Sequence, residues 1–274
     1  MNLTQASDAI GFVGAGRMAQ ALAAGISKQA TTLQVHFFDP SVEAAKKFME
    51  VCPQATTADS LSELAGRCRV LLLAVKPQVM PNVLQDLGPS VVEQHLVISV
   101  AAGISIQQYL KQLPTTKNVI RVMPNTPCLI GQGMSAVSAA ESVSQQDCEF
   151  AEGLLRSVGQ VVMVPESMMD AVTGLSGSGP AYVFTMIESL IAGAVKQGLP
   201  IETARQLTLQ TIIGATALAA GSEQSPAELT AQVTSPGGTT LAGLEALQQG
   251  NFKSTIESAV AAATQRSIEL SKSS

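Results

Sequence analysis

Short apolar runs alternate with amphipathic stretches in the N-terminal part of this 274-residue chain. The runs are rich in Val, Ile and Leu and end at Gly, Pro or Asp, which is typical of buried strands in a parallel sheet. This pattern predicts a doubly wound α/β domain, whose ligand binds at the carboxyl ends of the strands. The predicted strands are 10–13, 33–38, 55–57, 70–75, 96–100, 119–122, 133–137 and 161–164, and the helices are 17–28, 42–51, 79–87 and 145–157.

From about Glu166 onward the pattern is helical only. We therefore divide the chain into an α/β domain of residues 1–165 and an all-helical domain of residues 166–274. Two glycine-rich loops, Ser176–Pro180 and Ser235–Thr240, interrupt the helical half. The predicted helices of this half are 168–176, 180–197, 202–220, 226–233, 240–249 and 253–271.

The stretch from Ile10 to Ala21 is a strand, a tight turn and a helix with the glycine spacing G-x-G-x-x-[GA], completed by Gly14, Gly16 and Ala19. In a Rossmann-like domain these small residues permit the turn, admit the pyrophosphate of a dinucleotide and let helix and strand pack closely. A glycine turn of purely structural use is the alternative. The strand before the motif and the helix after it favour the nucleotide.

Asp39 ends the second predicted strand, where a carboxylate can accept hydrogen bonds from the adenosine ribose and would repel a 2′-phosphate. A helix-capping role is the alternative. Arg17, just after the glycines, is a candidate for a phosphate contact. These residue types favour NADH as the cofactor without excluding NADPH.

Three strand ends should line one crevice at the carboxyl edge of the sheet: Gly14–Gly16, Ala74–Pro77 and Ala101–Gly103. Lys76 follows a buried strand, and its loop is expected to reach over the nicotinamide end of the cofactor. A solvated loop lysine is the alternative interpretation.

The Ser235–Thr240 loop carries an anion site in our interpretation. Gly237 and Gly238 remove side chains, and Thr239 and Thr240 open a helix, so that several N–H groups converge on a carboxylate or phosphate. An ordinary helix–helix turn is the alternative. The Ser176–Pro180 loop has a similar build, but there close packing of two helices is favoured over ligand contact.

Composition and charge limit the kinds of partner that this protein can have. The net charge of -5 and the lack of a basic run argue against a nucleic-acid partner. Only 14% of residues are charged and 46% are hydrophobic, so much apolar helix surface must be covered, which suggests a homo-oligomer. The segment Ala181–Val195, interrupted by Glu188, is expected to be too short to span a membrane. The polar Met1–Asp8 segment does not resemble a signal peptide.

The four cysteines have no C-x-x-C spacing and are expected to be free, mostly buried thiols in a reducing cytoplasm. Both histidines, His36 and His95, lie away from the predicted carboxyl-end loops, so neither a His general base nor a His-ligated metal is expected. This absence favours a substrate whose C=N bond arrives already protonated, since hydride transfer alone then completes the reaction.

Five segments together resemble pyrroline-5-carboxylate reductase, in the order and spacing of that family. They are Gly14–Ala19, Ala74–Pro77, Arg121–Pro127, Leu175–Tyr182 and Ser235–Thr240. The resemblance runs from about Ala9 to the C-terminus. It implies the last step of proline biosynthesis, in which 1-pyrroline-5-carboxylate and NAD(P)H give L-proline and NAD(P)⁺.

The resemblance also implies roles for individual residues. The substrate carboxylate would lie against Ser235 and the amides of Gly237 to Thr240, the Thr240 hydroxyl would bond the ring nitrogen, and Glu166 would help line the site. Lys76 and Thr240 are the catalytic candidates. The cofactor would contact Gly14, Ala15, Gly16, Arg17, Met18, Asp39, Pro40, Ala74, Val75, Lys76, Pro77, Ala101, Ala102, Asn125 and Gln232.

Several positions depart from the family pattern. Members commonly use NADPH and often carry Ser, Asn or Arg at the end of the second strand, where this chain has Asp39-Pro40-Ser41. Gln232 stands where many members have Asn, and Thr57–Ser60 offers no Asn for the adenine. The usual NADPH preference is therefore an open question here.

The family's helical domain interlocks with that of a second subunit, and the dimers can assemble into larger rings. Two alternative functions stay open. A β-hydroxyacid dehydrogenase would want a lysine early in a long helix of the second domain, but Tyr182–Val195 has none before Lys196. A dinucleotide-binding regulatory protein without turnover would have no need of the Ser235–Thr240 loop.

Overall fold

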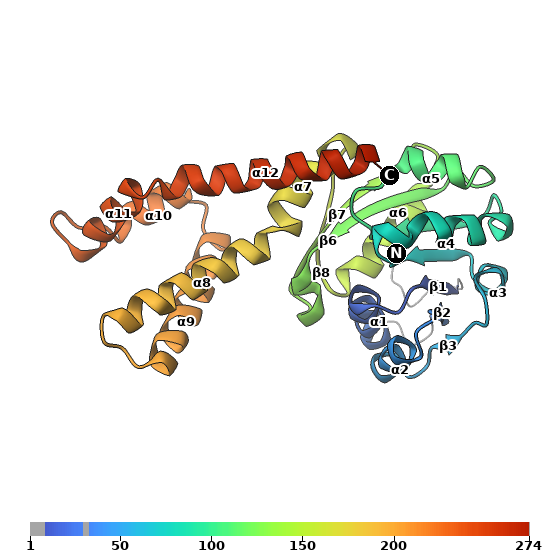
Figure 1. Cartoon of the computed structure of the whole chain (residues 1–274), viewed down its shortest axis with the longest axis horizontal. Helices are drawn as coiled ribbons and strands as arrows, with labels where there is room; N and C mark the ends of the chain where they lie inside the picture. The colour runs from blue at the N-terminus through green and yellow to red at the C-terminus, as the bar shows by residue number, and fades with distance from the viewer. Residues whose placement is uncertain (1–8, 30–32, 274) are drawn as a thin grey trace. The chain divides into compact units, whose positions relative to one another are not determined.

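The protein is described by a computed structural model over residues 9–29 and 33–273, so the Met1–Asp8 segment lies outside the described residues. Within them the strands form one eight-stranded sheet with the order β3-β2-β1-β4-β5-β6-β7-β8. All neighbouring pairs are parallel except β6 and β7, which run antiparallel, so the predicted α/β sheet is confirmed (Figure 1). The strands are β1 (Ile10–Val13), β2 (Val35–Phe38), β3 (Thr56–Thr57), β4 (Val70–Leu73), β5 (Leu96–Ser99), β6 (Val119–Pro124), β7 (Gly133–Ala139) and β8 (Gly159–Met163).

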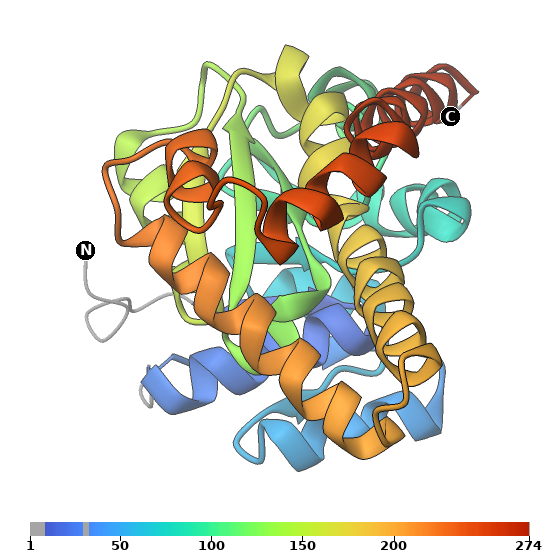
Figure 2. The same cartoon turned by 90° about the vertical axis from the view of Figure 1, so that its left-hand side faces the viewer.

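Both faces of the sheet are covered, which explains the continuous apolar runs. In β4, Val70 and Leu72 join the core on one face, while Leu71 and Leu73 join the core on the other. Each such side chain contributes about 1.5–3 kcal/mol when fully buried. Figure 2 shows the last three strands of this sheet side by side, β6 and β7 in green and β8 in yellow-green.

The helices around the sheet include the four that the sequence predicts and two that it did not. The unpredicted helices, α3 and α5, are seven residues each, and Ser60 and Ser105 cap their starts. These caps are the sequence signals that could have revealed them. The longer elements are α1 (Arg17–Gln29), α2 (Val42–Val51), α3 (Leu61–Arg67), α4 (Met80–Leu87), α5 (Ile106–Gln112) and α6 (Gln145–Arg156); the short 3-10 turns are η2 (Pro77–Val79), η3 (Gly88–Ser90) and η4 (Thr126–Ile130).

The chain divides into two compact units, residues 1–178 with 262–274 and residues 179–261. The division near residue 165 stays a sequence-based prediction. The remaining elements are η5 (Glu166–Met168), α7 (Met169–Val172), η6 (Thr173–Gly177, a π-helical turn), α8 (Gly179–Lys196), α9 (Ile201–Ala220), α10 (Pro226–Gln232), α11 (Thr239–Gln249) and α12 (Phe252–Ser273). The predicted helices of this half are thereby confirmed.

The expected loop at Ser176–Pro180 was wrong, because helical backbone continues through it. The N–H of Ser178 donates to the Thr173 carbonyl oxygen, which closes the π-helical turn. A Cβ on Gly177 would lie 2.4 Å from Cε of Met123 in β6. Gly177 therefore packs closely against the Met123 side chain of the sheet, and the expected packing of two helices at this loop is replaced by packing of a helical turn on a strand.

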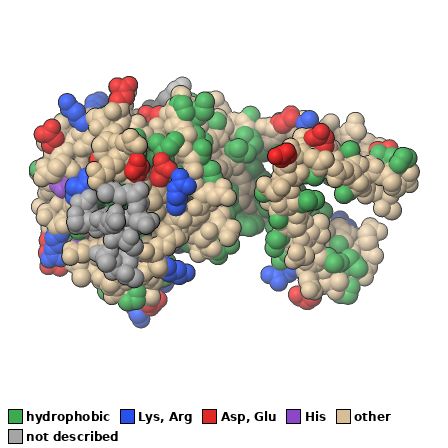
Figure 3. Space-filling model, turned by 180° about the vertical axis from the view of Figure 1, so that it is seen from behind, with side chains coloured by type: hydrophobic (Ala, Val, Ile, Leu, Met, Phe, Trp, Pro, Cys, Tyr) green, Lys and Arg blue, Asp and Glu red, His purple; other side chains and the backbone are tan. Residues whose placement is uncertain are grey.

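The helices of the second unit have almost no buried core of their own. In the described structure α8, α10 and α11 contain no buried residue, and α9 contains only Ala204 and Thr208. Large apolar side chains are instead exposed, as the hydrophobic groups on these helices show in Figure 3. They include Phe184, Ile201, Ile213 and Leu218, each more than 60% exposed.

The sequence predicted that the apolar segment Ala181–Val195 is too short to span a membrane, and this prediction was wrong about the length of the helix. The helical run Glu166–Lys196 extends over 31 residues and is long and apolar enough, by length and composition alone, to cross one. The run is longer than expected because η5, α7 and η6 continue into α8. Its apolar side chains require a covering surface.

Candidate functional site

The strand ends predicted to line a crevice lie at one edge of the sheet. Strands β1, β4 and β5 are neighbours and run parallel, so their carboxyl ends are adjacent. The Ala74 N–H donates to the Val13 carbonyl oxygen at 2.8 Å, and the Val100 N–H donates to that of Leu73 at 3.1 Å. The structure thus brings together the segments 14–16, 74–77 and 101–103.

The two motif glycines have different reasons to be glycine. Gly14 has a φ of 95°, and a Cβ there would lie 2.8 Å from Cγ1 of Val75 and 3.0 Å from the Ala74 carbonyl oxygen. A Cβ on Gly16 would meet nothing within 4 Å. Gly16 therefore faces open space at the start of α1, whose first N–H groups have no carbonyl partner within the helix. These residues fit a phosphate group, and the contact itself stays a prediction.

The start of α1 carries the remaining residues of this turn. Arg17, its first residue, is exposed, Met18 is partly buried against the core and Ala19 is fully buried. The buried Ala19 confirms the small residue that close helix–strand packing requires.

Asp39 is held by backbone groups on both sides. Its Oδ2 accepts a 2.7 Å hydrogen bond from the Ala15 N–H, and its Oδ1 accepts a 2.8 Å bond from the Ser41 N–H. Ser41 in turn caps α2, and Pro40 between them is exposed. The helix-capping alternative for Asp39 is therefore wrong, because Ser41 is the cap; Asp39 instead fixes the turn before it, and its carboxylate stays at the end of β2, where ribose contact is predicted.

Lys76 and the Ala101–Ala102 pair lie at the neighbouring strand ends. Lys76 is exposed and precedes the turn η2, which begins at Pro77. The Ala101 N–H donates to Oγ of Ser99, and this hydroxyl is 2.6 Å from the hydroxyl of Tyr109. Burial raises the pKa of Tyr109 to about 12, so this phenol stays neutral and fixes the end of β5.

Asn125 uses its amide to join segments of the first unit. Its Oδ1 accepts from the Met134 N–H at 2.9 Å, and its Nδ2 donates to Oγ of Ser176 at 3.3 Å. The contact with the nicotinamide ribose stays a prediction, and these two hydrogen bonds give Asn125 a structural role that the sequence did not suggest.

Glu166 belongs to a charged cluster that the sequence analysis missed. Its Oε1 accepts from the Ile106 N–H at 2.7 Å and lies 3.3 Å from Nη1 of Arg121. Nη2 of Arg121 is 3.9 Å from Oδ1 of Asp170, which accepts a 2.6 Å bond from Ser267. An arginine inside the apolar strand 119–122 was the signal that could have pointed to these carboxylates.

In the second unit, the Ser235–Thr240 segment forms the exposed start of α11. Gly237 has a φ of 68°, and the Gly238 N–H donates to the Ser235 carbonyl oxygen at 3.0 Å. Gly238 is the N-cap and has no side chain to accept the first N–H groups of α11. The first N–H groups of α11 can therefore face an anion, and that contact stays a prediction, whereas the Gly238 N–H that the prediction included is occupied by Ser235. Gln232, at the end of α10, donates to Oε1 of Gln224 at 2.8 Å.

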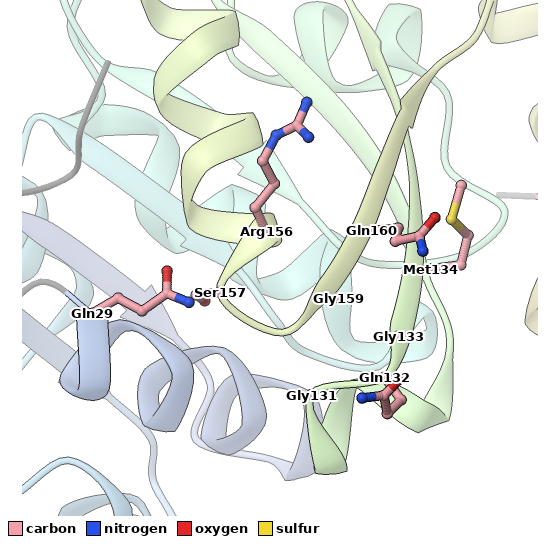
Figure 4. Close-up of a pocket in the computed structure, with 9 residues that line it drawn as sticks. All are labelled: Gln29, Gly131, Gln132, Gly133, Met134, Arg156, Ser157, Gly159 and Gln160. Atoms are coloured by element: carbon pink, nitrogen blue, oxygen red, sulfur yellow. The ribbon is translucent and has the colours of Figure 1, made fainter. Parts of the chain in front are cut away.

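A pocket elsewhere on the first unit contains none of the predicted site residues. It lies between Gln29, the turn 131–134 and the segment 156–160 (Figure 4). Gln29 is the last residue of α1, whereas the predicted phosphate contact is at its first residue, Arg17. The pocket is therefore not the predicted cofactor site.

Among the described residues, no group of three or more His, Cys, Asp or Glu side chains is placed to hold a metal ion. Cys52, Cys68 and Cys128 are buried free thiols and Cys148 is partly buried, which confirms the expectation for the thiols.

Comparisons with known proteins cover almost the whole chain. A family model described as pyrroline-5-carboxylate reductase dimerisation matches residues 166–270, and one described as NADP oxidoreductase coenzyme F420-dependent matches residues 9–103. Pyrroline-5-carboxylate reductase 3 of Xenopus laevis is 40% identical over 96% of both chains. The pyrroline-5-carboxylate reductase of Synechocystis is 42% identical over 96% of this chain and 98% of its own length.

Solved structures agree with these relatives. The Plasmodium falciparum pyrroline carboxylate reductase with NADP bound has a TM-score of 0.87 at 34% identity and covers 97% of this chain and 98% of its own. The Coxiella burnetii pyrroline-5-carboxylate reductase has a TM-score of 0.89 at 35% identity and covers 97% and 99%. Sequence and fold together therefore show that the chain belongs to the pyrroline-5-carboxylate reductase family.

Proposed function

We propose that this protein catalyses the last step of proline biosynthesis, the reduction of the C=N bond of 1-pyrroline-5-carboxylate to L-proline. The observation that carries this conclusion is the similarity of about 40% identity to reductases of this name over 96% of the chain. NAD(P)H supplies the hydride when bound.

The chain's own residues divide the work between the two units. In the second unit, the N–H groups of Thr239 and Thr240, which open α11, bind the substrate carboxylate together with the Ser235 segment, because a helix N-terminus favours negative charge. The Thr240 hydroxyl accepts a hydrogen bond from the protonated ring nitrogen and orients the C=N bond. No general base is needed, since the nitrogen carries its proton before and after reduction.

The first unit holds the cofactor through the carboxyl edge of its sheet. Gly14 shapes the turn, Gly16 and the N–H groups of Arg17 and Met18 face the phosphates, and Asp39 faces the adenosine ribose. The nicotinamide side of the cofactor is faced by Ala74–Pro77, Ala101–Ala102 and Asn125. Among these residues, Lys76 carries the charge. The Asp39 carboxylate favours NADH, because a 2′-phosphate would meet a negative charge.

Exposed apolar helices support a homodimer through residues 166–270, the region matched by the dimerisation model. A second subunit is the covering surface that the helices of the second unit need, rather than lipid. The dimers can assemble further into a ring. The free cysteines suit the reducing cytoplasm, where we place the enzyme.

An activity assay tests the proposal. Purified protein is given 1-pyrroline-5-carboxylate with NADH or NADPH, and absorbance at the reduced-nicotinamide band is followed. Substrate-dependent loss is expected, and 1-pyrroline, which lacks the carboxylate, should be reduced at least about tenfold less efficiently, since it loses a charge-assisted contact of about 1.5–3 kcal/mol. Cofactor binding without turnover would instead favour the regulatory protein.

A further inference from the structure

A buried arginine organises three separate segments of the first unit. The Arg121 side chain, on β6, is only 6% exposed and is paired with the carboxylates of Glu166 and Asp170. Both carboxylates are partly buried, at 33% and 26% exposed. A guanidinium buried in a sheet must keep its charged partners in place, because leaving it without them is strongly unfavourable.

Each carboxylate passes this constraint to a different segment. Oε1 of Glu166 accepts from the N–H of Ile106, the first residue of α5. Oδ1 of Asp170 accepts from the hydroxyl of Ser267, which is 4% exposed and lies in the last part of α12. Arg121 therefore connects the start of α5 with the end of α12.

The end of α12 also contacts the segment that precedes α5. A Cβ on Gly103 would lie 3.5 Å from Cβ of Leu270, and Nε2 of Gln108 donates to the Ser271 carbonyl oxygen at 3.3 Å. Ser99 and Tyr109 hold the other end of this segment through the Ala101 N–H. Residues 101–106 are thus fixed by α12, by Glu166 and by β5.

We propose that Arg121 is a positioning residue for hydride transfer, which fixes residues 101–106 through Glu166 and through the Asp170–Ser267 bond. This inference rests on the proposed function, in which Ala101 and Ala102 face the nicotinamide. Glu166 then acts through Ile106, not by touching the substrate. The C-terminal part of α12 becomes part of the support of the cofactor site, although no predicted site residue lies on it.

Two variants and a matched control test the proposal. Ser267→Ala removes one hydrogen bond and retains the ion pairs, while Arg121→Met removes the charge at similar length. Arg69→Met is the control, because Arg69 makes a 2.9 Å ion pair with Asp147 and precedes β4, at the edge opposite the carboxyl ends. Hydrogen–deuterium exchange of residues 101–106 is measured in the resting protein, and kcat, KM and the isotope effect of 4-deuterated cofactor are measured in turnover.

We expect exchange of residues 101–106 to rise about tenfold in Ser267→Ala and further in Arg121→Met, with no change in Arg69→Met. The kcat should fall by about 10-fold and 100-fold, the range that a small misplacement of reacting groups causes, with KM for the imine changed less than about threefold. The isotope effect should increase as hydride transfer becomes slower. Arg121→Lys should restore part of the protection.

Unchanged exchange of residues 101–106 in Ser267→Ala overturns the proposal, even if Arg121→Met fails to fold. A fall in kcat that Arg69→Met shares, with no increase in the isotope effect, also overturns it, because that pattern indicates general destabilisation. If the wild-type protein does not reduce the imine, the proposed function fails, and the exchange measurement still decides whether Arg121 fixes this segment.

Discussion

The N–H of Ala15 donates a 2.7 Å hydrogen bond to Oδ2 of Asp39, which joins the glycine turn after β1 to the end of β2. The other oxygen of the carboxylate accepts from the Ser41 N–H. Two backbone donors therefore fix the orientation of this carboxylate at the strand end where a dinucleotide's adenosine ribose is expected. The same carboxylate that shapes the turn is therefore the one proposed to lie beside the 2′ position of the adenosine ribose, where NADH and NADPH differ.

Replacing Asp39 by Ser should change cofactor choice. The variant loses the charge that repels a 2′-phosphate, and so the ratio of kcat/KM for NADPH to that for NADH should rise about tenfold, or about 1.4 kcal/mol. Both values are measured by steady-state assays. Asp86→Ser in α4 removes one exposed negative charge and should leave the ratio unchanged. An Asp39→Ser ratio equal to that of the wild type would rule out the ribose role.

The two motif glycines should separate folding from cofactor binding. Gly14→Ala places a Cβ against Val75 and Ala74 at a positive φ, and so it should lower the Tm and the yield of folded protein. Gly16→Ala meets no protein atom within 4 Å and should leave the Tm within about 2 °C, a change below 1 kcal/mol. Its Kd for NAD(P)H, from fluorescence titration, should nevertheless rise about tenfold or more. Wild-type affinity in Gly16→Ala would contradict the phosphate assignment.

The sequence predicts the parts of the fold that depend on local pattern. The apolar run of β4 predicts a strand from four consecutive residues, and the Gly14–Ala19 spacing predicts a turn and a closely packed helix from six. Their structure follows the prediction closely. All four residues of β4 are apolar and all four are buried, as expected for a strand that is covered on both faces of the sheet.

Features that depend on distant partners were not predictable in this way. Arg121 and Glu166 are 45 residues apart, and Ser267 and Asp170 are 97 apart, so no periodicity connects them. Gly177 packs against Met123 of another element, a neighbour 54 residues away that the local glycine pattern could not indicate, and its segment was therefore predicted as a loop. The Ser235–Thr240 loop could be predicted because its glycines and the helix start that follows them are adjacent in the sequence.

The Thr240 hydroxyl should matter for turnover and not for cofactor binding. Thr240→Ala removes the group proposed to orient the ring nitrogen, and kcat/KM for the imine should fall about 10–100-fold, as expected when one oriented hydrogen bond of about 1.5–3 kcal/mol is lost. The Kd for NAD(P)H should be unchanged. Thr240→Ser should restore most of the activity, and Thr239→Ala should be nearly neutral, since Thr239 acts through its backbone. A wild-type rate in Thr240→Ala would remove this residue from the mechanism.

Alkaline solution should destabilise the protein, because a buried thiol stays protonated in the folded protein at a pH where the same thiol is ionised in the unfolded chain. Burial raises the pKa of the Cys68 thiol from 9.0 to about 12, so above pH 9 the unfolded chain loses this proton before the folded protein does. The free energy of unfolding should therefore be flat below about pH 8 and should fall as pH rises from 9 to 12. Urea titrations at several pH values measure this slope. Cys68→Ala should make the decline shallower, and an identical slope would show that Cys68 does not contribute.

A charge on the exposed apolar helices should break the proposed homodimer. Phe184 on α8 is 63% exposed in the single chain, and burying it between subunits contributes about 1.5–3 kcal/mol, whereas a buried glutamate without a partner is strongly unfavourable. Phe184→Glu should therefore shift the protein toward monomer in sedimentation equilibrium and lower the specific activity on dilution. Val42→Glu is the matched control, because Val42 is 85% exposed on α2 of the first unit, outside the region matched by the dimerisation model. If Phe184→Glu stays as oligomeric as Val42→Glu at micromolar concentration, this face of α8 does not lie between subunits.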